Sequence, residues 1–369
     1  MSILHILALI VGAALISFIL TPLARNLALK KGWVAQPGER KIHTKPTPEL
    51  GGTAIFIAIL AMVAIQLAGE HFLGWKGFFT DATTNPLALV GILVGAAIIY
   101  ATGLIDDLVD LSPGLKLIGQ ILAATVVAAC GVRIGFIMLP GSSHVRDLGI
   151  LSIPLTIFFL VAFANIINLI DGLDGLAAGI CAIAAITMLL LARDASQIAA
   201  VILAALIIGS CLGFLRYNFN PASIFLGDEG ALLLGFMLGV ISMMGVMKTT
   251  AAIALAVPLL IVAVPIFDTA SAIVRRLRHG EAIEHADRKH IHHRLLGRGF
   301  SQRKTVIIIY LWSILLGVGA YAVSHTPSAI QIGTLVLLLI ITALIIWFLG
   351  LYDSARHHKP KHYAAKHSK

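Results

Sequence analysis

The sequence predicts an all-α, polytopic membrane protein with about 11 transmembrane helices. Hydrophobic residues make up 59% of the 369 residues and charged residues only 12%. Soluble domains are roughly 45–50% apolar and about 25% charged, because they need a charged surface. In addition, apolar segments follow one another with no polar domain between them. We therefore expect one transmembrane domain over residues 1–350.

Each membrane-spanning helix needs about 20 mostly apolar residues, and eleven segments meet this need. They begin near Ser2, Gly51, Pro86, Leu115, Leu151, Leu176, Gln197, Ala231, Thr250, Thr305 and Ser328. The first is expected to be a helix rather than a cleavable signal peptide, because no basic residue precedes it. Residues 132–150 contain proline, glycine and serines, which favours a loop with room for a short strand or hairpin.

Lysine and arginine predict the orientation of these helices. With the N-terminus outside and the C-terminus cytoplasmic, 22 of the 27 basic residues fall on inner segments. These segments are 24–50, 105–116, 170–175, 216–228, 268–304 and 351–369. Basic loops resist translocation, so residues 268–304 are expected to form a basic cytoplasmic loop and 351–369 a basic tail. The same bias explains the net charge of +9, and nucleic acid is not an expected partner.

The cysteines and the His-rich tail are given structural interpretations. Cys130, Cys181 and Cys211 lie in or beside apolar segments, at spacings that suit no metal site, so we expect packing residues. The tail could bind metal or anionic lipid, but its composition favours a solvated, disordered segment.

Ionisable residues gather where the predicted helices meet the inner side. The clusters lie at 103–116, 165–179, 216–230 and 265–269, the last leading into 285–295. A charge within a membrane span costs roughly 2.5–3.5 kcal/mol on insertion scales. Residues that are kept there against this cost are candidates for function, so we expect a cytoplasmic pocket that is assembled from several helix ends.

The acids in these clusters suggest a divalent cation. They are Asp106, Asp107, Asp110, Asp171, Asp174, Asp228, Glu229 and Asp268. So many carboxylates would repel one another, and oxygen ligands without cysteine favour Mg²⁺ or Mn²⁺. Because Mg²⁺ takes only one or two protein carboxylates, some acids must have another role. Capping of a helix N-terminus is the alternative for Asp110 and Asp174.

Basic residues and histidines accompany the acids. Lys116 lies beside the first cluster, and Arg288, Lys289 and Arg294 flank the motif HIHH. His290, His292 and His293 lack the i, i+4 spacing of helical zinc ligands, so binding of a phosphate or sugar fits them better. A basic loop on anionic lipid remains an alternative, although positive-inside bias does not predict three histidines in four positions. Acids, cations and a membrane location together suggest phosphoryl transfer to or from a lipid.

The clusters, in this order from RKIHTKPTPELGG (40–52) to HADRKHIHHRLLGRGFS (285–301), resemble the polyprenyl-phosphate N-acetylhexosamine-1-phosphate transferase family. The form HIHHRL looks like the branch that makes undecaprenyl-pyrophosphate N-acetylglucosamine. The resemblance implies that an N-acetylhexosamine 1-phosphate, with N-acetylglucosamine favoured, passes from a UDP-sugar to undecaprenyl phosphate and releases UMP. It also implies Mg²⁺ or Mn²⁺, a bacterial inner membrane, a cytoplasmic active site and a first step of cell-envelope glycan synthesis. The resemblance does not decide whether the protein forms a homodimer.

The resemblance also implies roles for the phosphate side of the site. Asp106 and Asp107 match the family's paired aspartates, which would orient or deprotonate the lipid phosphate or help to hold the metal. Asp228 matches the metal ligand, with Asn168 beside it, and Lys116 would meet the diphosphate. Asp106 is favoured as the base. A phosphate monoester is largely a dianion at neutral pH, since its second pKa is about 6, so positioning is an alternative and larger role for the pair.

On the donor side, the resemblance places Gly172 and Asp174 at the uridine, with Phe225 available to stack on uracil. The residues that would hold the sugar phosphate are His290, His292, His293 and Arg294. Asp171 matches a motif position as either nucleophile or scaffold, and direct attack is preferred to a phospho-aspartate intermediate. The family usually has a small hydroxyl residue, glycine and serine after GD. In GDEGA, Glu229 could therefore approach the metal or face away from it.

Two rival classes are weighed against this hypothesis. CDP-alcohol phosphatidyltransferases also contain a DG motif, but DGLDGLAAG lacks the arginine that follows it there. A transporter would place ionisable residues near the membrane midplane, often with repeat symmetry, whereas these acids lie at inner helix ends. A transferase for another UDP-N-acetylhexosamine remains an alternative.

Overall fold

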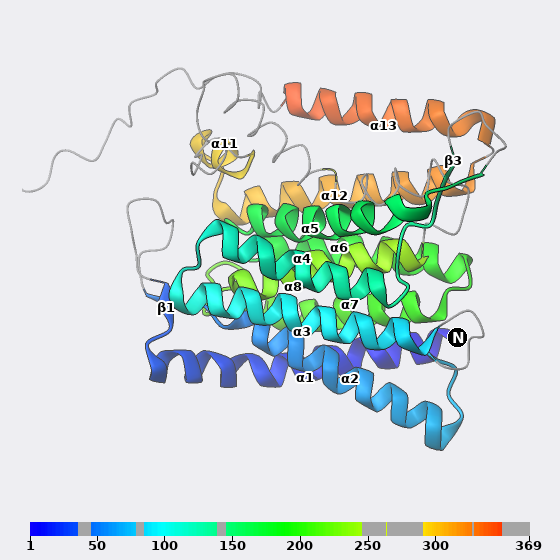
Figure 1. Cartoon of the computed structure of the whole chain (residues 1–369). Coiled ribbons are helices and arrows are strands. Elements are labelled where there is room, and N and C mark those ends of the chain that lie inside the picture. The colour runs from blue at the N-terminus through cyan, green and yellow to red at the C-terminus, as the bar shows by residue number, and fades with distance from the viewer. Residues whose placement is uncertain are drawn as a thin grey trace, which may run out of the picture.

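The computed structural model in Figure 1 shows long helices that lie side by side along one direction. The structure describes residues 1–35, 46–78, 85–138, 145–245, 263, 291–326 and 328–348. The long helices are α1 (Ile3–Lys31), α2 (Gly51–Leu73), α3 (Pro86–Val109), α4 (Pro113–Ala129), α5 (Ser152–Ile170), α6 (Leu176–Asp194), α7 (Ile198–Asn218), α8 (Gly227–Gly245), α12 (Gln302–His325) and α13 (Ser328–Phe348). Within the described part, the chain is almost entirely helical.

Eight helices of the described part are long and apolar enough to cross a membrane, and two shorter apolar helices accompany them. This supports the predicted polytopic membrane protein. Ten of the eleven predicted starts lie within four residues of a helix start. The eleventh, near Thr250, falls outside the described residues, as does the tail 351–369. The total of 11 spans and the orientation of the termini therefore remain predictions.

The segment between α4 and α5 contains the predicted hairpin. Strand β3 (Phe136–Met138) pairs antiparallel with β4 (Val145–Asp147), and the short 3-10 turn η1 (Gly149–Leu151) leads into α5. A second, two-residue ladder was not predicted: β1 (Val34–Ala35) pairs with β2 (Thr47–Pro48) just before α2. In Figure 1, β1 and β3 lie at opposite ends of the bundle.

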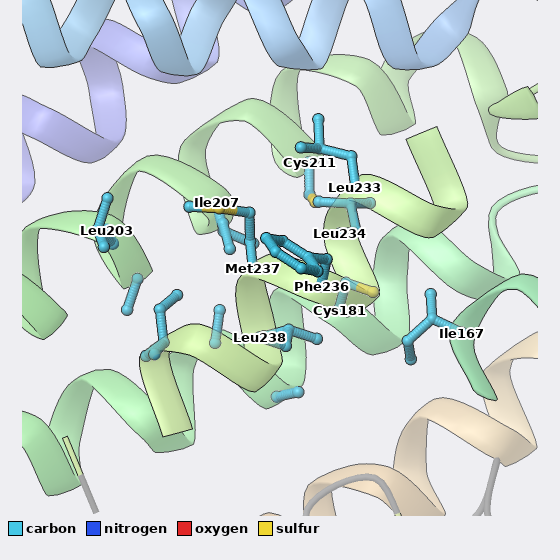
Figure 2. Close-up of a cluster of buried hydrophobic side chains, with 14 of the residues drawn as sticks. Ile167, Cys181, Leu203, Ile207, Cys211, Leu233, Leu234, Phe236, Met237 and Leu238 are labelled. Atoms are coloured by element: carbon cyan, nitrogen blue, oxygen red, sulfur yellow. The ribbon is translucent and has the colours of Figure 1, made fainter. Parts of the chain in front are cut away.

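The centre of the bundle is built by α6, α7 and α8, which pack against one another. Figure 2 shows the sulfur atoms of Cys181 and Cys211 among apolar side chains such as Ile207, Leu234 and Phe236. Both cysteines are free and buried, while Cys130 is free and partly buried. This confirms the two as packing residues.

The α1–α7 contact depends on two glycines, Gly209 and Gly213 of α7. A Cβ atom added at Gly209 would lie 2.2 Å from the carbonyl oxygen of Ile10, and one at Gly213 would lie 2.2 Å from that of Ala14. Small residues four apart let membrane helices approach backbone to backbone. This pair fixes α1 against the centre of the bundle.

We expect Gly213→Leu to destabilise the folded protein, because the backbone of α1 cannot retreat without separating from α7. Overpacking of this kind costs about 1–3 kcal/mol, occasionally more. The measurement is a denaturant or thermal unfolding curve of the detergent-solubilised protein. Leu212→Ala is the matched control, since Leu212 is half exposed and should shift the curve little. Equal unfolding curves for Gly213→Leu and wild type would contradict the close α1–α7 contact.

The alternating helices bring distant parts of the chain to one end of the bundle, which we call the site end. It comprises the last turns of α1, α3, α5 and α7 and the first turns of α2, α4, α6, α8 and α12. Hydrogen bonds cross this end, for example from Arg25 Nε to the Ser223 carbonyl and from Arg303 Nε to the Asn220 carbonyl. The described polar clusters at 103–116, 165–179 and 216–230 therefore gather at one end, as predicted.

Candidate active site

Four polar side chains from four helices meet at the site end. Lys116 Nζ of α4 lies 2.8 Å from Asp106 Oδ2 of α3 and also contacts Asp228 Oδ2 of α8. The same ammonium lies 3.4 Å from Asn168 Oδ1 of α5, and Asn168 Nδ2 donates to Asp228 Oδ1 at 2.8 Å. We call these four residues the Lys116 cluster.

The Lys116 cluster carries an excess of negative charge. The Asp106 and Asp228 carboxyls contact each other as well as the one ammonium between them. Asp171, directly after α5, adds a third acid nearby. The pKa of Asp171 lies well above its usual range, chiefly because its carboxyl is buried and secondarily because Asp228 and Asp107 are negative. Such a centre favours a further cation.

Asp107 determines where Asp228 lies. Its Oδ1 accepts the backbone N–H of Asp228 at 2.9 Å, and its Oδ2 accepts that of Glu229 at 3.0 Å. The carboxylate thus caps the N-terminus of α8 from a neighbouring helix. Gly227 has φ of 73° and lies so close that a Cβ there would be 2.7 Å from Asp107 Oδ2. These contacts make Asp107 a positioning group for Asp228.

An amide pair holds α4 to α5 one turn deeper. Asn165 Nδ2 donates to Gln120 Oε1 at 2.5 Å, and Gln120 Nε2 donates back to Asn165 Oδ1 at 3.3 Å. Gln120 lies four residues after Lys116 and Asn165 three before Asn168, so each pair shares a helix face. The sequence analysis missed this pair, although the i, i+4 and i, i+3 spacings were visible signals.

Asp174 joins two loops beside the cluster. Its Oδ2 accepts the backbone N–H of Ala222 at 3.0 Å and Asn220 Nδ2 at 2.9 Å, and Asn220 Nδ2 also donates to Gln302 Oε1 at 2.7 Å. The N-cap of α6 is Gly175, in the left-handed region with φ of 80°. The alternative of Asp174 as an N-cap is therefore wrong. Gly172, in the same turn, is exposed, and the uridine role of both remains a prediction.

Asp110 is not an N-cap either. Ser112 is the N-cap of α4, because Pro113 occupies the first helical position. Asp110 instead ends α3 as its C-cap, with φ of 55° and its N–H donating to the Asp106 carbonyl. An aspartate tolerates this left-handed conformation better than most residues, so its place in the turn has a local backbone cause.

Phe225 lies beside the segment that precedes α2. Its backbone N–H donates to the Pro48 carbonyl at 2.8 Å, and its carbonyl accepts the N–H of Gly51 at 3.0 Å. Glu49 forms an isolated bridge with Phe225, and its negative charge acts on Asp107 and Asp171. The sequence analysis missed Glu49, although an acid just before the glycine pair that opens a helix was a signal.

The predicted histidine side of the site is described only in part. His290 and Asp268 lie outside the described residues. His292, His293 and Arg294 belong to the short helix α11 (Ile291–Gly297), which packs against α12 and lies at the site end in Figure 1. Only Arg294, half-buried, has a described side chain among these three. Their role in holding a sugar phosphate remains a prediction.

The donor atoms of the Lys116 cluster suit a hard divalent cation. The carboxylates of Asp106 and Asp228 and the amide oxygen of Asn168 converge, and all are oxygens. Among the described residues, no group of three or more His, Cys, Asp or Glu side chains encloses a metal position. Mg²⁺ needs no such cage, because water and substrate phosphates fill most of its shell. The residues therefore fit Mg²⁺ or Mn²⁺ better than zinc.

The chain is similar to several known proteins. Residues 89–246 match the model of glycosyl transferase family 4. The chain is 35% identical to a probable undecaprenyl-phosphate N-acetylglucosaminyl 1-phosphate transferase of Bacillus subtilis (strain 168). This similarity extends over 335 residues, which are 91% of this chain and 89% of the relative. It is 35% identical to a decaprenyl-phosphate N-acetylglucosaminephosphotransferase of Mycolicibacterium smegmatis, over 90% of this chain and 86% of the relative. An undecaprenyl-phosphate alpha-N-acetylglucosaminyl 1-phosphate transferase of Salmonella typhi is 28% identical over 87% of this chain and 85% of its own.

Proposed function

Because the chain belongs to glycosyl transferase family 4 and is therefore a transferase, we propose that it transfers N-acetylglucosamine 1-phosphate from UDP-N-acetylglucosamine to undecaprenyl phosphate. UMP is the second product. The similar proteins named above carry a polyprenyl phosphate and N-acetylglucosamine in their names. The single observation that carries the proposal is the Lys116 cluster, where acids and a cation from four helices share one position.

The site end faces the cytoplasm in this proposal. Of the 27 lysines and arginines, 22 lie on segments assigned to that side, and basic loops are retained there. A nucleotide sugar is a cytoplasmic substrate, whereas the polyprenyl chain of the acceptor stays in the bilayer. The protein thus acts in a bacterial inner membrane, at the boundary where its two substrates meet.

The metal site of the proposal is formed by Asp228, with Asn168 and Asp106 beside it. A bound Mg²⁺ or Mn²⁺ would neutralise the diphosphate and stabilise the UMP leaving group. In the structure, the Lys116 ammonium pairs with the carboxylates of Asp106 and Asp228. A metal ion at the same carboxylates would take the place of this ammonium. With a metal ion held by these carboxylates, the flexible Lys116 ammonium would be free to contact the diphosphate.

The transfer itself is a direct displacement. An oxygen of the undecaprenyl phosphate forms a bond to the β-phosphorus of the UDP-sugar, and the bond from that phosphorus to the bridging oxygen of UMP breaks. Asp106 orients the attacking phosphate, which is largely a dianion already, and Asp107 holds α8 and hence Asp228. Asp171 serves as scaffold in this proposal, because direct attack by the lipid phosphate needs no covalent intermediate on a carboxylate.

The donor is held on the side of the loops that Asp174 joins. Gly172 and Asp174 lie at the uridine in this proposal, and Phe225 stacks on the uracil. The sugar phosphate is held from α11 and the loop before it by His290, His292, His293 and Arg294. A membrane transporter is less well supported, because the acids of the Lys116 cluster lie at one end of the bundle rather than at its middle.

The test is UMP release by the purified protein with undecaprenyl phosphate, Mg²⁺ and a panel of UDP-sugars. We expect release with UDP-N-acetylglucosamine, little with UDP-glucose, and none after chelation of the metal with EDTA. Release that is faster with another UDP-N-acetylhexosamine would change the named sugar only. No release with any N-acetylhexosamine donor would contradict the proposed function.

A further inference from the structure

One buried carboxylate at the site end has no part in the mechanism above. Glu229 follows Asp228 in the first turn of α8, and its side chain has 0% solvent exposure. Burial of a carboxylate is costly unless hydrogen bonds compensate it. The contacts that Glu229 makes therefore indicate its role.

Those contacts lie on α2. Glu229 Oε1 accepts the backbone N–H of Thr53 at 2.8 Å, and the Thr53 hydroxyl lies 3.2 Å from Oε1 and 3.0 Å from Oε2. The Tyr100 hydroxyl is 2.9 Å from the same Thr53 oxygen. Leu50, at the N-cap position of α2, offers no side-chain cap. Glu229 therefore supplies from another helix the acceptor that the first turn of α2 lacks.

Backbone contacts leave little room for α2 to sit elsewhere. A Cβ added at Gly52 would lie 2.3 Å from the backbone nitrogen of Gly230, and one at Gly103 would lie 2.4 Å from the Cα of Glu229. The three helices α2, α3 and α8 thus meet at glycines around the Glu229 carboxylate. The hydrogen bonds to Thr53 select one position for α2 within this close packing.

The segment that this contact fixes lies beside residues 224–227, which lead into Asp228 and which we call the Asp228 loop. Gly51 N–H donates to the Phe225 carbonyl at 3.0 Å and Gly52 N–H to the Leu226 carbonyl at 2.8 Å. The same segment carries Glu49, whose negative charge faces the negative charges of Asp107 and Asp171.

We propose that Glu229 is a positioning residue that docks residues 47–52 against the Asp228 loop and so shapes the donor side of the site. The sequence left open whether Glu229 approaches the metal or faces away from it. In the structure, Glu229 faces α2 rather than the Lys116 cluster. The docking of residues 47–52 by Glu229 does not depend on the proposed function. The effect of Glu229 on the donor side rests on the proposed function, since it is measured as the KM for the UDP-sugar.

The structural test is hydrogen–deuterium exchange of the full-length, detergent-solubilised protein. In Glu229→Ala we expect the amides of residues 51–53 to exchange about tenfold faster, as expected for loss of a buried hydrogen-bond acceptor. The amides of Asp228 and residue 229 should change little, because Asp107 still caps α8. Glu229→Gln keeps one acceptor oxygen and should restore most of the protection. Ser242→Ala, at another buried position of α8, is the matched control and should leave residues 51–53 unchanged.

The kinetic test uses the same variants. Glu229→Ala should raise the KM for UDP-N-acetylglucosamine about tenfold while kcat stays within about threefold, and Glu229→Gln should rescue most of the KM. The Mg²⁺ concentration for half-maximal activity should not move. Unchanged exchange at residues 51–53, an altered Mg²⁺ requirement, or equal loss of protection throughout the protein would each overturn the proposal. If the wild type released no UMP, the proposed function would fail while the exchange measurement still decided the role of Glu229.

Discussion

Asp228→Ala is expected to lower turnover by about 10³-fold or more while the protein still folds. Among the described acids, Asp228 is the one that contacts both Lys116 and Asn168, so its loss removes the carboxylate around which the proposed metal site is built. Metal stabilisation of transition-state charge is worth several kcal/mol, and about 1.4 kcal/mol corresponds to tenfold in rate. The measurement is UMP release at saturating Mg²⁺, with a thermal unfolding curve of the same sample.

Asp110→Asn is a matched control for charge at the same end of the bundle. Asp110 is exposed, and asparagine tolerates its positive φ, so this variant should keep nearly wild-type turnover. Asp228→Asn, which retains the shape but not the charge, should be almost as inactive as Asp228→Ala. Wild-type turnover in either Asp228 variant would remove this residue from the metal site.

Lys116→Gln is expected to lose about 100-fold or more in turnover and to become unusually responsive to Mg²⁺. Without the ammonium, Asp106 and Asp228 face each other uncompensated, which should destabilise the metal-free protein by about 1–3 kcal/mol. A ligand that binds only the folded state raises its stability. Added Mg²⁺ no longer has to displace an ammonium, so it should raise the melting temperature of Lys116→Gln more than that of wild type.

The measurement is a pair of melting curves for each protein, with and without Mg²⁺, beside the UMP-release assay. Lys304→Gln is the control, since Lys304 is exposed at the start of α12 and lies outside the cluster. It should match wild type in both assays. A Mg²⁺-induced shift that is smaller in Lys116→Gln than in wild type would show that the lysine and the cation do not compete for these acids.

Much of the fold could be predicted because hydrophobic length is a strong signal in a membrane protein. The start of α6 was predicted at Leu176 and that of α3 at Pro86, where glycine or proline punctuates the sequence. The start of α8 was placed four residues too late, at Ala231, because Gly227, Asp228 and Glu229 are polar. Their helical conformation depends on Asp107, a cap supplied by a distant part of the chain.

The composition of the candidate site was predictable, but the direction of its side chains was not. Asp106, Lys116, Asn168 and Asp228 were expected near one another, and the structure brings them together. The Glu229 side chain points toward α2 because three helices pack together at glycines. No local sequence pattern encodes this packing. For Asp110 and Asp174, N-capping was an alternative that rested on residue preference alone, whereas Pro113 and the loop at Asn220 decide their actual partners.

The central claim is that a sugar phosphate, rather than a sugar alone, moves from the nucleotide to the lipid. The most direct measurement gives the purified protein undecaprenyl phosphate, Mg²⁺ and UDP-N-acetylglucosamine labelled with ³²P at the β-phosphate. We predict that the label enters the lipid extract in equal amount to the UMP released. Label that remained in water as UDP or as free sugar phosphate would contradict the account.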